Sequence, residues 1–328
     1  MIPYIHVPDL PLGPIKLHPF GLLVATGVIV GSILATRRAR ARGVDVDKLN
    51  SFITWMLLSG FILSHMIDEV FYHPEEIKKA PWTLLMPWTG LSSFGGFIGG
   101  LIGVIAWKFV KAVPLVRVGD LFTIPKFQLR DKPEPIMPLC DIILAVFPVA
   151  WIFGRSGCSV VHDHPGMKAP LDSWLAVAYG PYKLAEVKTY GPIELRYGSM
   201  PQYDLGTLEL MFTVCVAIFF AATWSRRLPT GSYIIATALS YAPVRLVMDF
   251  FRIREGDSAD LRYGNLTFAQ WCCVALFVFG LVMAYVVREN VKKGYDPIEA
   301  HLKRLAPRPP EPPLEGGDKG DKDASAEA

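Results

Sequence analysis

Charged residues are scarce in this chain of 328 residues: only 19% are Asp, Glu, Lys or Arg, against about a quarter in typical soluble domains. The net charge of +3 is too small to indicate a nucleic-acid-binding protein, and five cysteines are too few, and odd in number, for a disulfide scaffold. We find no internal repeat, which argues against the repeat-built transporter folds. Apolar residues, in contrast, make up 52% of the chain and fall into blocks. The composition therefore indicates a protein that resides in a lipid bilayer.

Seven blocks are apolar and long enough to cross roughly 30 Å of hydrocarbon, although the fourth is short and contains proline. We therefore predict an all-α polytopic membrane protein with about seven transmembrane helices. The predicted spans are Leu17–Thr36, Ser51–Tyr72, Leu91–Lys111, Pro138–Phe153, Leu205–Trp224, Gly231–Phe251 and Asn265–Val287.

Basic residues follow every odd-numbered span, and this pattern sets the orientation, because Lys and Arg favour the cytoplasmic side. The first, third, fifth and seventh spans are followed by such residues: Arg37, Arg38, Arg40 and Arg42; Lys108, Lys111 and Arg117; Arg226 and Arg227; Arg288, Lys292 and Lys293. The N-terminus is thus expected outside and the C-terminus inside. Only Lys16 precedes the first span, so a cleaved signal peptide is not expected.

Two segments do not have membrane composition. The long outer loop Gly157–Asp204 contains a tryptophan and several tyrosines and is expected to fold as a small periplasmic head. Residues 1–290 are predicted to form one transmembrane domain that includes this loop. Residues 291–328 end in a segment rich in Pro, Gly, Asp and Lys and are expected to be a disordered cytoplasmic tail.

Ionisable residues inside a span are costly, so each one is a candidate for function. Arg245, Asp249 and Arg252 in the sixth span share one helical face at spacings of four and three. One interpretation is an Arg245–Asp249 pair that only locks helix packing. The other is an anion site, in which arginines present their planar guanidiniums to a phosphate.

The fourth span ends in Gly154-Arg155-Ser156-Gly157-Cys158, where two glycines are expected to allow a sharp turn that presents Arg155 to a ligand. Alternatively, Arg155 only extends to the lipid headgroups. A metal site formed by Cys158, His162 and His164 is disfavoured, because the run lacks a second cysteine pair. We therefore predict no metal and no cofactor.

The second span ends with His65, Asp68 and Glu69 on one face, either as a structural polar cluster or as part of a catalytic site. Glycines at the start of the third span suit close helix packing. By the predicted topology, all of these residues fall on the outer side together with Arg155 and Arg245. The sequence therefore predicts a cationic pocket that opens toward the outer leaflet.

These motifs resemble the prolipoprotein diacylglyceryl transferase family. The resemblance lies in Gly90–Gly96 (Gly-Leu-Ser-Ser-Phe-Gly-Gly), Gly154–Cys158 and Tyr241–Arg252, and continues in Leu266–Gln270 at the start of the last span. Order, spacing and topology agree with the family over about 14–288. The resemblance implies transfer of the diacylglyceryl group of phosphatidylglycerol to the lipobox cysteine thiol of a prolipoprotein, in the bacterial inner membrane.

Carried over position by position, the resemblance assigns Arg155 to the arginine of the family's signature loop and Gly166 to that loop's later glycine. Arg245 matches an essential arginine, while Asp249 and Asp163 stand where glutamates are usual. The departures concern the groups that handle protons and hydrogen bonds. Phe94 replaces a histidine proposed as the base, Cys158 replaces an asparagine, Phe20 replaces a tyrosine, and His65 stands where an arginine is often found.

The predicted catalytic residues are His65, Arg155 and Arg245, with the arginines neutralising the phosphate and His65 accepting the thiol proton. His162, His164 or the two guanidiniums alone are the alternatives for activating the thiol. A rival function is a non-catalytic lipid-binding or assembly protein that has lost the base. The predicted substrate-binding residues are Phe94, Gly95, Gly96, Gly154, Cys158, Asp163, Gly166, Asp249 and Arg252; the expected partners are phosphatidylglycerol and the prolipoprotein signal peptide.

Overall fold

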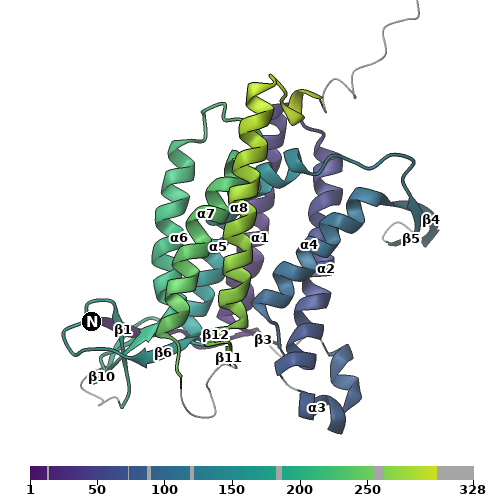
Figure 1. Ribbon diagram of the computed structural model, residues 1–328. Helices are drawn as coiled ribbons and strands as arrows, with labels where there is room; N and C mark the ends of the chain where they lie inside the picture. The colour runs from purple at the N-terminus through teal and green to yellow at the C-terminus, as the bar shows by residue number, and fades with distance from the viewer. Residues whose placement is uncertain are drawn as a thin grey trace, which may run out of the picture.

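Seven apolar helices form the body of the protein in the computed structural model, which describes residues 1–12, 15–72, 74–86, 90–118, 122–181, 187–254 and 262–300 (Figure 1). Six are long and apolar enough to cross a membrane, and α4 offers the shorter apolar stretch Gly95–Phe109. The helices are α1 (Pro19–Arg42), α2 (Val46–Tyr72), α4 (Ser93–Phe109), α5 (Met137–Val161), α6 (Leu205–Ala222), α7 (Ser232–Met248) and α8 (Phe268–Lys292). The predicted all-α polytopic membrane fold is confirmed.

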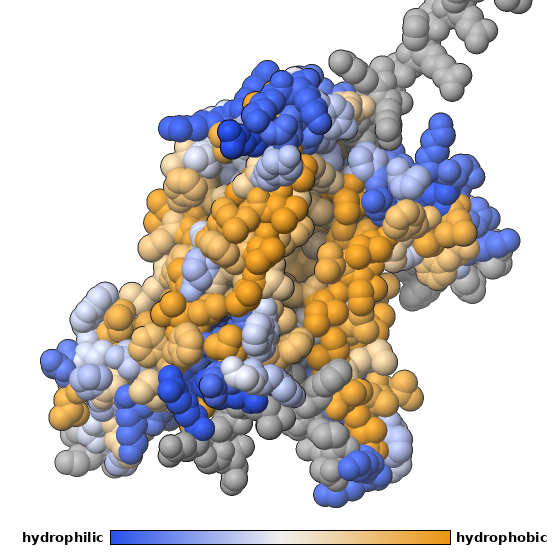
Figure 2. Space-filling view, viewed as in Figure 1, coloured by the Kyte–Doolittle hydropathy of each residue, from blue (hydrophilic) through white to orange (hydrophobic). Residues whose placement is uncertain are grey.

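An apolar belt surrounds the bundle. Figure 2 shows hydrophobic surface along the helices and hydrophilic surface at their two ends. Large apolar side chains on several helices are exposed there, such as Ile29, Leu58 and Ile218. Such surface suits lipid tails rather than water.

A small sheet caps one end of the bundle, which we call the sheet end (Figure 1). Its strand order is β6-β10-β7-β1-β9-β8. The strands are β1 (Ile2–His6), β6 (Pro165–Lys168), β7 (Ala176–Tyr179), β8 (Val187–Tyr190), β9 (Ile193–Arg196) and β10 (Met200–Asp204). The folded head predicted for the long loop is confirmed, but its inner strand β1, which pairs with β7 and β9, comes from the N-terminal segment and was not predicted.

The remaining elements are short and connect the helices. They are β2 (Leu10–Leu12), β3 (Ile15–Leu17), α3 (Pro74–Lys79), the 3₁₀ turns η1 (Pro81–Leu85) and η3 (Asp249–Phe251), the hairpin β4 (Val110–Val118) with β5 (Phe122–Leu129), and β11 (Arg262–Tyr263) with β12 (Leu266–Thr267).

Helix α5 differs most from its predicted span. It continues eight residues past the predicted end at Phe153, so the sharp turn expected at Gly154–Cys158 is wrong and the whole motif is helical. The glycine at 157 has a different use here: a Cβ atom at Gly157 would lie 2.8 Å from the ring of Phe20 on α1. Close helix contact, rather than a turn, explains this residue.

The core at the other end of the bundle joins α1, α2, α4 and α5. Its largest fully buried side chains include Leu49, Phe52, Trp107 and Leu139. Ile298, which follows α8, is buried in the same cluster. The chain beyond the predicted domain boundary at 290 thus packs on the bundle as far as Ile298, and 301–328 lie outside the described residues.

Glycines at spacings of four bring α4 against the backbone of α2. A Cβ atom at Gly99 would lie 2.5 Å from the Ser59 carbonyl oxygen, and one at Gly103 would lie 2.6 Å from that of Trp55. Backbone cannot move aside as a flexible side chain can, so these positions accept only glycine.

Gly99→Ala is therefore expected to lower the free energy of unfolding by about 1–3 kcal/mol, as overpacking in a tight contact does. Thermal unfolding of the detergent-solubilised protein measures this change. Gly21→Ala is the matched control, because nothing lies within 4 Å of the added atom. Equal midpoints for the two variants would contradict the role given to the α2–α4 contact.

Candidate functional site: two arginines on a buried glutamate

Arg155 and Arg245 meet at the carboxylate of Glu209 in the interior of the bundle. The Nε atom of Arg155 (α5) lies 2.9 Å from Oε1 of Glu209 (α6), and Nε of Arg245 (α7) lies 3.8 Å from Oε2. Tyr241 donates a hydrogen bond to Oε1 of Glu209 at 2.7 Å, and the Trp151 indole donates to the same oxygen at 3.2 Å. All three charged side chains are at most 6% exposed. The helices thus fix two guanidiniums side by side in a nearly dry site.

Asp249 extends this network toward the last helix. Its Oδ1 lies 2.6 Å from Nη1 of Arg245 and accepts a hydrogen bond from Nε of Arg252, while its Oδ2 accepts one from Thr267. Thr267 also caps α8 in a reciprocal arrangement with Gln270, whose amide donates to the Leu246 carbonyl. The beginning of α8 therefore holds the end of α7 that carries Arg245. The Arg245–Asp249 pair foreseen from the sequence is present, and it is one part of a larger network.

The carboxylates contact only some of the guanidinium nitrogens of Arg155 and Arg245. Glu209 contacts the Nε sides, Asp249 takes Nη1 of Arg245, and Nη1 of Arg155 donates to the Cys158 sulfur at 3.6 Å. The Nη2 groups of Arg155 and Arg245 make no hydrogen bond to any residue that the structure describes. A guanidinium that carboxylates hold on one side, and whose remaining N–H group can donate to a ligand, is suited to bind an anion.

Glu209 is the main residue that the sequence analysis missed. The signal was present: a single glutamate lies between two leucines inside the predicted span Leu205–Trp224. An ionisable side chain at such depth requires a partner, and here the partners are both arginines.

An apolar groove of about 450 Å³ lies between α6 and α7, the helices that carry Glu209 and Arg245. Leu208 and Val244, which flank Glu209 and Arg245 in sequence, line it together with Leu175 of the head. Its walls are almost entirely apolar, so it suits a hydrocarbon chain.

His65 does not have the environment expected of it. Its Nδ1 lies 3.2 Å from the carbonyl oxygen of Gly90 and its Nε2 lies 3.0 Å from that of Thr83, and the side chain is buried. The sequence placed His65 on one face with Asp68 and Glu69, but its two ring nitrogens contact backbone oxygens of Gly90 and Thr83. No nitrogen of this ring is left to contact a substrate thiol.

His162 is also fully engaged. It ends α5 in the left-handed conformation, with φ of 52°, and its two ring nitrogens contact Asp204 at 2.6 Å and the Ile5 carbonyl at 3.0 Å. Its ring stacks on Tyr4, and burial raises the pKa of that tyrosine. His162 thus joins α5 to the sheet, and the disfavoured metal set of Cys158, His162 and His164 is not assembled.

The other predicted binding residues lie at several different places in the fold. Cys158, Asp249 and Arg252 belong to the arginine network, and Asp163 pairs with His164 where the chain leaves α5. Gly95 packs against the backbone of α2 near Leu63 and Ser64, and a Cβ atom at Gly96 would touch only Ser64. Gly166 lies between the carbonyls of Tyr203 and Phe251 and bridges to Arg252, so it ties the sheet to the end of α7. Gly154 has only the Trp151 ring near it, and the Phe94 side chain lies outside what the structure describes.

The comparison with known protein families decides the assignment. The family model described as prolipoprotein diacylglyceryl transferase matches residues 9–129 and 126–286, most of the chain. The chain belongs to this family. Its arginine network lies where the family motifs at Gly154–Cys158 and Tyr241–Arg252 meet in space.

Curated relatives agree over nearly their whole length. A phosphatidylglycerol–prolipoprotein diacylglyceryl transferase of Agrobacterium fabrum is 26% identical over 296 residues, covering 87% of this chain and 93% of the relative. Proteins of the same name from Acinetobacter baylyi and Pseudomonas paraeruginosa are 23% and 26% identical, covering 89% and 86% of this chain and 96% and 93% of theirs. The similarity thus spans both the bundle and the head.

Proposed function

We propose that this protein transfers the diacylglyceryl group of phosphatidylglycerol to the lipobox cysteine thiol of a prolipoprotein. The observation that carries the proposal is the pair of buried arginines held on Glu209, whose Nη2 groups make no hydrogen bond to a described residue. A lipid phosphodiester carries one negative charge, and two convergent guanidiniums in a site of low dielectric can bind its oxygens strongly.

In the reaction, the thiolate sulfur of the acceptor forms a bond to the glycerol carbon of the lipid. The bond from that carbon to the phosphate oxygen breaks, and glycerol phosphate leaves with the electron pair. Negative charge grows on the leaving phosphate, and Arg155 and Arg245 stabilise it where it develops. The thiol proton passes to water, and the departing glycerol phosphate carries the second negative charge.

The apolar groove between α6 and α7 gives the lipid its orientation in this proposal. With the phosphate on Nη2 of Arg155 and Arg245, an acyl chain extends between α6 and α7 past Leu208 and Val244. Gly154, Cys158, Asp163, Asp249 and Arg252 act as binding or positioning residues around the phosphate. Gly95, Gly96 and Gly166 act by holding α4 and the sheet in place.

The acceptor thiol is activated by the guanidiniums themselves, since a cation beside a thiol favours the thiolate. Phe94 stands where the family has a histidine, so that base is absent. His65 is a positioning residue that holds the end of α2 to Gly90 and Thr83.

His65→Gln is expected to keep the pH dependence of transfer unchanged, because glutamine can still donate to one of the two carbonyls and no titrating base is removed. The measurement is the pH profile of kcat and of kcat/KM with a lipobox peptide. Loss of the acidic limb of the kcat profile in this variant, with an unchanged thermal midpoint, would restore His65 as the base.

The sheet end is proposed to face the periplasm, with the protein in the bacterial inner membrane. The support is the basic residues in or just after the last turns of α1, α4, α6 and α8, all at the opposite end of the helices. An alkaline phosphatase fusion after Ala328 is therefore expected to be inactive, and one in the loop between β8 and β9, after Gly191, to be active. The reverse pattern would show the opposite orientation.

Complementation of a strain depleted of its own transferase tests the function, with lipidation of a reporter prolipoprotein read by mass spectrometry. The expected product carries one diacylglyceryl group on its cysteine. Phe94→His separates the enzyme from the non-catalytic alternative: if only this variant lipidates the reporter, the natural protein binds lipid without catalysing transfer.

A further inference from the structure

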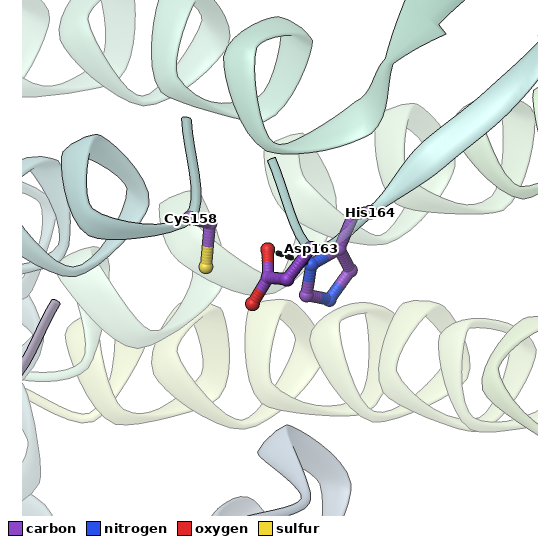
Figure 3. A group of neighbouring side chains, drawn as sticks. All are labelled: Cys158, Asp163 and His164. Atoms are coloured by element: carbon purple, nitrogen blue, oxygen red, sulfur yellow. Dashed lines mark hydrogen bonds and ion pairs between the residues drawn. The ribbon is translucent and has the colours of Figure 1, made fainter. Parts of the chain in front are cut away.

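Three metal-binding side chains gather where α5 ends. One ligand atom each from Cys158, Asp163 and His164 lies within 4.8 Å of the others, and Figure 3 shows the Asp163 carboxylate between the Cys158 sulfur and the His164 ring. Cys158 belongs to the last turns of α5, whereas Asp163 and His164 follow its end. These three side chains come together only because the chain changes direction after Val161, at the end of α5.

The reversal is fixed by the left-handed His162, whose ring is held by Asp204 and by the Ile5 carbonyl. Asp204 in turn accepts the Thr207 N–H and caps α6. The segment that carries Asp163 and His164 therefore starts from a rigid anchor. Such preorganisation lowers the ordering cost of binding a ligand.

The donor set selects a class of ion. A thiolate, an imidazole and a carboxylate together suit zinc and neighbouring divalent transition metals, whereas magnesium and calcium require oxygen ligands. Donor atoms in a tetrahedral zinc site lie roughly 3.5 Å apart. Asp163 and His164 are 41% and 24% exposed, so their side chains can make the small approach that is needed.

The position of the Cys158 sulfur is also fixed. Nη1 of Arg155 donates to it at 3.6 Å, so the sulfur is held near Asp163 and His164 before any ion binds. The charge of Arg155 is itself balanced by Glu209 at 2.9 Å, which reduces its repulsion of a cation. The Cys158 side of the site is thus buried and fixed in position, whereas the side formed by Asp163 and His164 is accessible to an ion and a water ligand.

We propose that Cys158, Asp163 and His164 form a binding site for a divalent transition-metal ion of the zinc class, with an open fourth coordination position. Binding forms metal bonds to sulfur, nitrogen and oxygen, breaks the S–H bond of Cys158 and releases its proton to solvent. It also places a cation beside Arg155, so zinc inhibits transfer. This last consequence rests on the proposed function, whereas the site itself does not.

Titration of the full-length, detergent-purified protein with Co²⁺ tests the site, read by thiolate-to-cobalt charge-transfer absorption and by competition with Zn²⁺. We expect one Co²⁺ per chain, complete loss of the absorption in Cys158→Ser, and at least tenfold weaker binding in Asp163→Asn and His164→Gln. Cys215→Ser is the matched control and is expected to bind as the unchanged protein does, and thermal midpoints confirm that each variant is folded.

Absorption that persists in Cys158→Ser, or the lack of a saturable band in the folded protein, would overturn the site. The transfer assay with and without Zn²⁺ is read separately. Lack of transfer in metal-free buffer counts against the proposed function alone, and transfer unaffected by bound Zn²⁺ counts against inhibition alone.

Discussion

Replacing Arg155 or Arg245 by lysine is expected to slow diacylglyceryl transfer by about 100- to 1,000-fold, the cost of removing one preorganised donor from a developing charge. Lysine keeps the charge but presents a single ammonium, which cannot contact Glu209 and the phosphate at once. The measurement is kcat with phosphatidylglycerol and a lipobox peptide in detergent or proteoliposomes.

Arg196→Lys is the matched control, since Arg196 pairs with Glu194 in the sheet and not with the arginine network. Its rate is expected to equal that of the unchanged protein. If both Arg155→Lys and Arg245→Lys transfer at the normal rate, the arginines only hold the helices together and the phosphate binds elsewhere.

Glu209→Gln is expected to have the largest effect on stability, with a loss of about 3–5 kcal/mol in the free energy of unfolding, because it leaves the buried guanidinium of Arg155 without its carboxylate partner, whereas Arg245 keeps Asp249. The side chain keeps its shape and can still accept the Tyr241 hydrogen bond, so packing is not the cause. Transfer is expected to fall as well, because the arginines lose the partner that fixes their Nε sides. Thermal unfolding in detergent, together with the transfer assay, measures both effects.

Glu134→Gln provides the comparison for this variant. Glu134 pairs with Lys48 at 2.8 Å, but its side chain is 20% exposed, so its loss is expected to cost about 1 kcal/mol or less. If Glu209→Gln is no less stable than Glu134→Gln, the guanidiniums have another partner or are solvated, and the description of a dry network is incorrect.

Much of the bundle was predictable from the sequence. The length of the apolar segments indicates which of them cross a bilayer, and the basic residues at the ends of alternate segments indicate their direction. Arg245, Asp249 and Arg252 were also recognisable, since spacings of four and three along one helix predict a shared face without any tertiary information. The structure agrees with this prediction, because Asp249 pairs with both Arg245 and Arg252.

Tertiary partners explain what the sequence could not reveal. The two glycines around Arg155 favoured a turn, but packing of Gly157 against Phe20 keeps α5 helical. His65 was placed on one face with two acids, whereas the oxygens it meets belong to Gly90 and Thr83, residues that arrive only when the chain folds back beside α2. Glu209 has no local partner at all, so its role emerges only when α5 and α7 are placed beside α6.

The position of β1 sets the order in which the protein can be assembled. This strand of the first residues pairs with β7 and with β9, which are separated from it by more than 150 positions of chain that include α1, α2, α4 and α5. Four helices must therefore be synthesised and inserted before the first strand finds either neighbour. His162, whose Nε2 lies 3.0 Å from the Ile5 carbonyl oxygen, cannot adopt its final environment earlier. The arginine network forms later still, because Glu209 and Arg245 lie on α6 and α7, so a chain that has inserted only its first four long helices lacks it.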